Sequence, residues 1–274
     1  MSIKGKFPDS QSLAAALRIH ILEMITPVRG SHIGSALSAA DILAVLYYDV
    51  LRYDPDDPTD DSRDRLIFSK GHAGSALYAV LAESGFFPVS TLEGYCRNGS
   101  FLSGHVSSHN VAGVEFSTGS LGHGLPVGAG LAYSLKKRNN SAAVTVIMGD
   151  GECDEGTTWE TAIFAAAHKL NNLNLIIDRN RIQALGNTED IMPLEPLQEK
   201  WQSFNWHVSR IDGHDHDLLC KTLMLRTDKP HCIIADTIKG RGVSYMENSL
   251  EWHYRTPNEQ LFKQAITELG GKLK

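Results

Sequence analysis

The sequence predicts an α/β fold in which a mostly parallel sheet is flanked by helices. From residue 142 onward, short apolar segments alternate with helix-like segments, a pattern typical of parallel strands covered on both faces. Two of these apolar runs, 142–148 and 173–177, lead directly into short polar loops, and ligands bind at such strand ends in open α/β sheets. The 274 residues, 42% hydrophobic and 21% charged, are enough for a large core.

The expected elements begin with an amphipathic helix at 10–26 that ends at Pro27 and a second helix at 38–51 with Ser38 as its N-cap. An acidic, proline-containing stretch at 53–65 is expected to be a surface loop. The remaining expected elements are a strand at 66–69, a helix at 74–84, a long loop at 96–120, a glycine-rich helix at 122–138, strands at 142–148, 173–178, 206–211 and 231–236, and helices at 156–169, 196–204 and 215–226. No repeat or linker interrupts the chain, so residues 1–274 are expected to form one domain.

Several classes of protein are disfavoured by composition. The net charge of −6 does not suggest binding to nucleic acid or to a membrane surface. No apolar run is long enough to span a bilayer, and the N-terminus lacks the apolar region of a signal peptide. The four cysteines form no CxxC pair, so reduced thiols in a cytoplasmic protein are expected.

Two polar residues follow neighbouring predicted strands and indicate a metal site. Asp150 follows the first apolar run, and Asn180 follows the second. Their carboxylate and amide oxygens are the hard ligands that Mg²⁺ or Ca²⁺ prefers. Since only one strong carboxylate is present, such an ion is expected to share its coordination shell with phosphate oxygens of a substrate or cofactor.

Glycines and histidines mark the rest of the candidate site. The glycines that crowd the start of the predicted helix at 122–138 indicate either a diphosphate site or close helix packing, because the spacing of a dinucleotide fingerprint is absent. His72, His105 and His123 lie beside glycines in loops, which favours a polar pocket. The run 213–217 contains two histidines and two aspartates, but its position at a strand-to-helix turn favours Asp215 as an N-cap over a metal site.

Six motifs in order resemble the N-terminal, thiamine diphosphate-binding domain of transketolases. The motifs are Ser31-His32-Ile33-Gly34, Ser69-Lys70-Gly71-His72-Ala73, Ser103-Gly104-His105, Ser117-Thr118-Gly119-Ser120-Leu121-Gly122, Gly149-Asp150-Gly151-Glu152-Cys153-Asp154-Glu155-Gly156 with Asn180 after it, and Lys239-Gly240-Arg241-Gly242-Val243-Ser244. The resemblance runs from about Leu13 to about Pro257 and is strongest to short subunits encoded separately from the rest of the enzyme.

The resemblance implies a thiamine diphosphate- and Mg²⁺-dependent enzyme, with Ca²⁺ or Mn²⁺ able to substitute, that transfers a two-carbon ketol unit between sugar phosphates. The implied catalytic residues are His32, His105 and His253. The implied cofactor-binding residues are His72, Gly119, Ser120, Leu121, Gly151, Glu152, Asn180 and His253. The implied metal ligands are Asp150, Asn180 and the main-chain oxygen of Ile182. Two positions depart from the family pattern: His123 replaces a usual glutamine, and the segment Trp252-His253-Tyr254-Arg255-Thr256-Pro257 differs from the more familiar WHGKAP.

The resemblance also implies a partner. In this family the glutamate that activates the cofactor belongs to a second, pyrimidine-binding domain, which has no counterpart in these 274 residues. We therefore expect a separate pyrimidine-binding and C-terminal subunit in an α2β2 heterotetramer. The alternatives are a 1-deoxyxylulose-5-phosphate synthase-like or 2-oxoacid decarboxylase- or dehydrogenase-like subunit, and a non-catalytic regulatory protein on the same fold. The histidine set favours a transketolase over a 2-oxoacid decarboxylase, and the intact Asp150, Asn180, His32, His72 and His105 argue against a regulatory protein.

Overall fold

A five-stranded parallel sheet forms the centre of the computed structural model, which describes residues 2–272. The strands lie in the order β1-β2-β3-β5-β4, and every neighbouring pair is parallel. The α/β prediction is therefore confirmed, and the sheet is parallel throughout. The strand bounds are Arg65–Phe68 for β1, Val144–Gly149 for β2, Leu173–Arg179 for β3, His207–Asp212 for β4 and His231–Asp236 for β5.

Both faces of the sheet are covered by helices. Successive side chains of a strand point to opposite faces, so each strand contributes to both apolar clusters. On β2, Val144, Val146 and Met148 pack into one apolar cluster, whereas Ile147 packs into the other. This explains why the central strands are mostly apolar.

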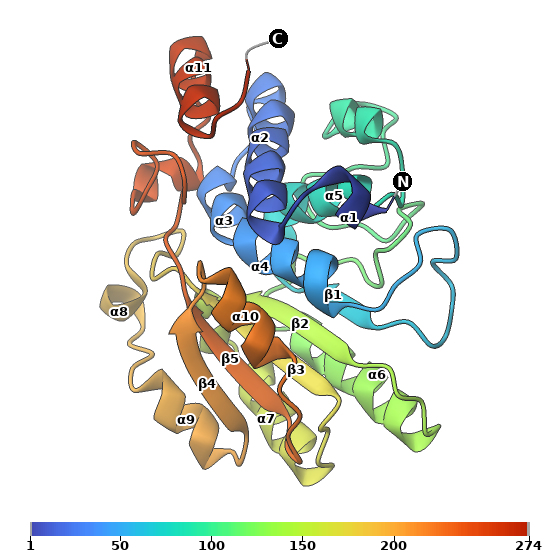
Figure 1. The fold of residues 1–274 in the computed structure, drawn as a ribbon. Helices are drawn as coiled ribbons and strands as arrows, with labels where there is room; N and C mark the ends of the chain where they lie inside the picture. The colour runs from blue at the N-terminus through green and yellow to red at the C-terminus, as the bar shows by residue number, and fades with distance from the viewer. Residues whose placement is uncertain (1, 273–274) are drawn as a thin grey trace.

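Helices from the two ends of the chain cover one face, and helices from its middle cover the other (Figure 1). On the first face lie α2 (Ser10–Val28), α3 (Ile33–Ser38), α4 (Ala40–Val45), α5 (Gly74–Glu83) and α10 (His216–Leu223). Helix α11 (Glu259–Glu268) lies farther from the sheet and packs against α2. On the second lie α6 (Gly124–Lys137), α7 (Gly156–Ala167) and α9 (Leu197–Ser203). Shorter helices are α1 (Ile3–Lys6), α8 (Thr188–Ile191), the π-helix η1 (Leu46–Val50) and the 3₁₀ helices η2 (Gly71–Ala73), η3 (Val89–Gly94), η4 (Asp150–Asp154) and η5 (Leu250–His253).

Two expectations about the first helices are wrong. Helix α2 does not end at Pro27 but continues to Val28 and closes on Arg29 in the left-handed region. Ser38 is not an N-cap, because it is the last residue of α3 and the expected helix at 38–51 is divided into α4 and η1. The Ser38 hydroxyl instead donates to the buried carboxylate of Asp178 at 2.6 Å.

Glycines within and just before α6 serve close packing at three positions. A Cβ atom at Gly128 would lie 2.3 Å from Val146 Cγ2, and one at Gly124 would lie 2.4 Å from the Ser69 side chain. At Gly122, just before the helix, a Cβ atom would lie 2.5 Å from the Cβ atom of Glu155. Of the two alternatives for these residues, the structure supports close packing.

The histidine-rich turn after β4 also has a structural role. Asp215 is the N-cap of α10 and accepts a hydrogen bond from the backbone N–H of Leu218, which confirms the prediction. His214 and His216 turn inward to the buried carboxylate of Asp41. Within residues 2–272, no helix is long and apolar enough to cross a bilayer.

Candidate active site

A cavity of about 330 Å³ lies where β2 and β3 end. Gly149 and Asp178 are paired in the sheet register, so the loops that follow the two strands lie beside each other, as the sequence predicts. The cavity is lined by His32, Ser35, Lys70, His72, His105, Gly119, Leu121, Gly149, Asp150, Gly151, Glu152, Asn180, Ile182, Gln183, Ala184, Leu185, His253 and Tyr254. It therefore contains every residue predicted for the site except Ser120 and His123.

Three predicted histidines gather around His32. Ring centroids of His253, His72 and His105 lie 5.0, 5.3 and 5.8 Å from that of His32. The backbone holds this arrangement, because His32 adopts a left-handed conformation at the start of α3 and its N–H donates to the His253 carbonyl at 2.6 Å. Imidazoles separated by more than 200 residues in the chain thus share one cavity.

The environment favours the neutral form of three of these histidines. Burial, with help from His105 and Lys239, lowers the pKa of His32 to about 4. Burial and the charge of Lys239 lower the pKa of His253 to about 3, and burial and Lys70 lower the pKa of His72 well below its usual value. Neutral imidazoles at pH 7 can accept a proton from a hydroxyl or donate a hydrogen bond to it.

Lys239 connects the histidine cluster to a predicted metal ligand. Its buried ammonium donates to His253 Nδ1 at 2.9 Å and to the main-chain oxygen of Ile182 at 2.6 Å. Since Nδ1 accepts, a neutral His253 carries its proton on Nε2. Burial and the nearby ammonium of Lys70 lower the pKa of Lys239 to about 8.

The three predicted metal ligands meet in this cavity. Asp150 Oδ2 accepts from Arg179 Nη1 at 2.8 Å and from the Arg181 N–H at 2.7 Å, which holds the carboxylate at the end of β2. Asn180 Oδ1 and the Ile182 carbonyl lie on the adjoining loop. A carboxylate, an amide oxygen and a carbonyl form the donor set that fits Mg²⁺, and the Ile182 oxygen already faces a cation, the ammonium of Lys239. In the described part of the chain, no three His, Cys, Asp or Glu side chains are placed to hold a metal ion by themselves.

Other predicted cofactor-binding residues differ in their placement. Gly119 has a φ of 153°, and a Cβ atom there would lie 3.1 Å from the His105 ring, so glycine permits that imidazole to approach. The buried Glu152 carboxylate accepts from Ser69, Gly122 and Gly149, and it therefore braces the loops around the cavity. Leu121 lines the cavity, but Ser120 is exposed outside it.

His123, which the sequence groups with the pocket histidines, is also exposed and does not line the cavity. Its Nδ1 instead lies 2.9 Å from the carbonyl oxygen of Leu121. The prediction of a shared pocket is therefore wrong for this residue.

Two buried lysines of the site, Lys70 and Lys239, were not predicted from the sequence. Lys70 lines the cavity and pairs with the Asp178 carboxylate, which also accepts from Ser38 and Thr237. These contacts outweigh burial and keep the pKa of Asp178 below its usual value. Lys70 and Lys239 each lie inside one of the six motifs, and that position was the available signal. Together they supply the positive charge that an anionic cofactor requires.

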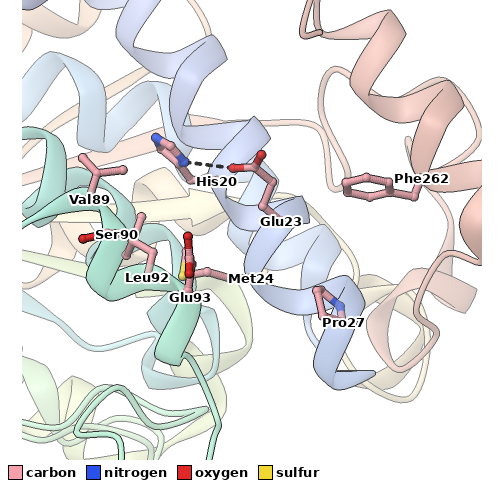
Figure 2. Close-up of a pocket in the computed structure, with 9 residues that line it drawn as sticks. All are labelled: His20, Glu23, Met24, Pro27, Val89, Ser90, Leu92, Glu93 and Phe262. Atoms are coloured by element: carbon pink, nitrogen blue, oxygen red, sulfur yellow. Dashed lines mark hydrogen bonds and ion pairs between the residues drawn. The ribbon is translucent and has the colours of Figure 1, made fainter. Parts of the chain in front are cut away.

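A larger hollow of about 490 Å³ lies elsewhere, between α2, η3 and α11 (Figure 2). His20 and Glu23, one turn apart on α2, point toward each other in the wall of this hollow, with 3.3 Å between His20 Nδ1 and Glu23 Oε2. None of its lining residues belongs to the predicted site. The smaller cavity is the candidate active site because the histidines, oxygen donors and lysines gather there.

Comparison with known proteins agrees with this geometry. The sequence profile of the family described as transketolase, thiamine diphosphate binding domain, matches residues 9–272. The chain is 39% identical over 264 residues to the 6-deoxy-6-sulfo-D-fructose transketolase subunit SqwG of Clostridium sp. (strain MSTE9), covering 95% of this chain and 96% of that protein. It is 41% identical over 263 residues to an apulose-4-phosphate transketolase subunit of Actinobacillus succinogenes, covering 95% of each.

Full-length transketolases share the same fold over part of their length. The crystal structure of transketolase from Campylobacter jejuni matches with a TM-score of 0.91 and 32% identity, covering 96% of this chain and 43% of that chain. The family resemblance seen in the six motifs is therefore confirmed. The chain belongs to the transketolase family and corresponds to its thiamine diphosphate-binding domain.

Proposed function

We propose that this protein is one subunit of a two-component transketolase that transfers a two-carbon ketol unit between sugar phosphates. The observation that carries the proposal is the gathering of His32, His72, His105 and His253 beside Asp150, Asn180 and Ile182 in one cavity. Thiamine diphosphate, when bound, supplies the carbanion chemistry that breaks and forms carbon–carbon bonds. The protein positions reactants and moves protons.

His32, His105 and His253 are the proposed acid–base residues. Cleavage of a ketose requires removal of a hydroxyl proton, and the acceptor aldehyde requires a proton on its oxygen. A neutral imidazole accepts the first proton and returns it to the second oxygen. His72, whose pKa is lowered by burial and by Lys70, is proposed to contact the cofactor in its neutral form.

Asp150, Asn180 and the Ile182 oxygen are the proposed Mg²⁺ ligands, with diphosphate oxygens in the remaining positions. Lys239 would release the Ile182 oxygen to the metal. Gly119, Leu121, Gly151 and Glu152 are proposed to line the cofactor, and the exposed Ser120 to reach it only when the partner subunit is bound.

We further propose that the partner is a pyrimidine-binding subunit, that the assembly is α2β2, and that residues 1–274 form one domain. Relatives that match 95% of this chain are named as transketolase subunits, which supports a two-component enzyme. Their names specify a sulfosugar and apulose 4-phosphate, so the substrate panel includes ketose phosphates and a sulfonated ketose. The four free cysteines, two of them buried, support a cytoplasmic location.

The acid–base assignment is tested with His32→Ala and His105→Ala in the reconstituted complex. Removal of a positioned acid–base group should lower turnover about 10²–10⁴-fold with little change in the free energy of unfolding, because both side chains face the cavity. A large loss of stability with an unchanged rate per folded molecule would contradict the assignment.

The metal assignment is tested by calorimetry of thiamine diphosphate with the complex in Mg²⁺. Asp150→Ala should abolish Mg²⁺-dependent binding while circular dichroism keeps the folded signal. Asp154→Ala is a matched control, because this nearby carboxylate accepts from Gln183 and does not line the cavity. Equal cofactor affinity in the Asp150 variant and in the wild type would refute the metal site.

A further inference from the structure

Tyr254 stands at the mouth of the histidine cavity. Its ring centroid lies 4.6 Å from that of His253 and 5.9 Å from that of His32, so it packs against two of the proposed acid–base residues. It is also among the residues that line the cavity. The side chain nevertheless remains 63% exposed, which means that one face of the ring contacts the histidines while the rest is open.

The hydroxyl of Tyr254 has no structural role of its own. Within residues 2–272 it makes no hydrogen bond, although its near neighbour Tyr245 donates to the Leu261 carbonyl at 2.7 Å. An exposed aromatic ring beside a polar cavity, with an unused hydroxyl, is suited to a ligand that has both apolar C–H faces and hydroxyl groups. A sugar chain has this chemistry.

Tyr254 also separates the cavity from a second hollow. That hollow, of about 740 Å³, is lined by Tyr254 together with Thr26, Arg29, Thr256, Pro257, Asn258, Glu259 and Phe262. Arg29 is exposed, and its guanidinium makes no hydrogen bond or ion pair within the described residues. Because Tyr254 lines both hollows, removing its ring would open the histidine cavity toward the space beside the Arg29 guanidinium.

We propose that Tyr254 is a specificity-determining residue for the sugar substrate. Its ring limits the length of sugar chain that the cavity accepts, and its hydroxyl bonds a sugar hydroxyl beyond the two-carbon unit. The histidines surround the reacting end, so a residue on their outer side contacts the part of the sugar that differs between substrates. This proposal rests on the proposed ketol transfer.

The test compares the wild-type complex with Tyr254→Phe, Tyr254→Gly and the control Tyr245→Phe. Each complex is assayed with ketose phosphates of five, six and seven carbons, and cofactor affinity is measured by calorimetry. Tyr254→Phe should lower kcat/KM about three- to tenfold, the size of one lost hydrogen bond. Tyr254→Gly should raise the ratio of kcat/KM for the seven-carbon over the five-carbon donor about fivefold or more, because a packed aromatic contact no longer limits the chain. Tyr245→Phe should leave this ratio unchanged.

A second measurement does not depend on turnover. A hexitol phosphate, which lacks the carbonyl and cannot react, should bind to the Tyr254→Phe complex about three- to tenfold more weakly than to the wild type. If Tyr254→Gly changed all donors by the same factor, or if the Tyr254 variants only weakened association with the partner subunit, the inference would be overturned. Absence of ketol transfer in the wild-type complex would instead contradict the proposed function, which separates the two failures.

Discussion

Replacing Asp41 by Asn tests whether the buried cluster behind the active site acts as one unit. Asp41 accepts from Arg18 Nη1 and Nη2 at 3.0 and 2.5 Å, from His214 Nδ1 at 2.6 Å and from His216 Nε2 at 3.1 Å. Asparagine keeps one oxygen and presents an NH₂ group to the remaining donors. The Arg18 guanidinium would then stay buried without its carboxylate. Removing one partner of a buried ion pair costs about 3–5 kcal/mol.

The assay is urea unfolding followed by tryptophan fluorescence. The matched control is Asp61→Asn, which breaks the exposed pair with Arg138 and should cost less than about 1 kcal/mol. A loss below about 1 kcal/mol for Asp41→Asn, equal to that of the control, would refute the account of this cluster.

The difference in free energy of unfolding between the wild type and Asp41→Asn should depend on pH with a definite sign. Burial opposes the charged form of Asp41, but His214, His216 and Arg18 outweigh it and hold its pKa well below the usual 3.8. The folded protein therefore binds fewer protons at this site than the unfolded chain. The contribution of Asp41 is complete above about pH 4 and is lost as the pH falls below that value. A stability difference that grew on acidification would contradict this explanation.

Three further predictions concern other parts of the molecule. Burial opposes the charge of His20, yet Glu23 and Glu83 raise its pKa from 6.5 to about 9. The free energy of unfolding lost in His20→Gln, about 3 kcal/mol below pH 6.5, should vanish as the pH rises through 9. A pH-independent loss in denaturant titrations would contradict this. Gly128→Ala should destabilise the protein by about 1–3 kcal/mol, because the new Cβ atom meets the Val146 side chain. Gly130→Ala, with open space around the new Cβ atom, should stabilise it by about 0.5–1 kcal/mol. Equal melting temperatures of the two variants would refute the packing argument. His32 and His253 should remain neutral at pH 5.5 in ¹⁵N NMR spectra, since their pKa values are lowered to about 4 and about 3, and a midpoint near 6.5 would show that the pocket does not desolvate them.

The strands were predictable because they carry their signal locally. The runs that form β2 and β3 are mostly apolar, as is typical of strands covered on both faces. The placement of the proposed metal ligands was predictable for the same reason, since Asp150 and Asn180 follow those strands directly. The parallel pairing of β2 with β3 then places the loops that carry these two residues beside each other.

The features that could not be predicted depend on distant partners. Ser38 has the local properties of an N-cap, but its hydroxyl bonds Asp178, which lies 140 residues away. Nothing near Lys239 in the chain shows that its ammonium lies between His253 and the carbonyl of Ile182. Tyr254 differs from the family pattern in sequence, but only the structure shows that it packs on His253 and His32.

The most direct test of the central claim is a titration of the purified chain with the pyrimidine-binding subunit, followed by a ketol-transfer assay with thiamine diphosphate and Mg²⁺. We predict no transfer by the chain alone, and activity that rises with added partner and saturates near a one-to-one ratio, as a symmetric α2β2 assembly requires. Thiamine diphosphate-dependent ketol transfer by this chain alone, in a preparation free of the partner, would contradict the two-component account.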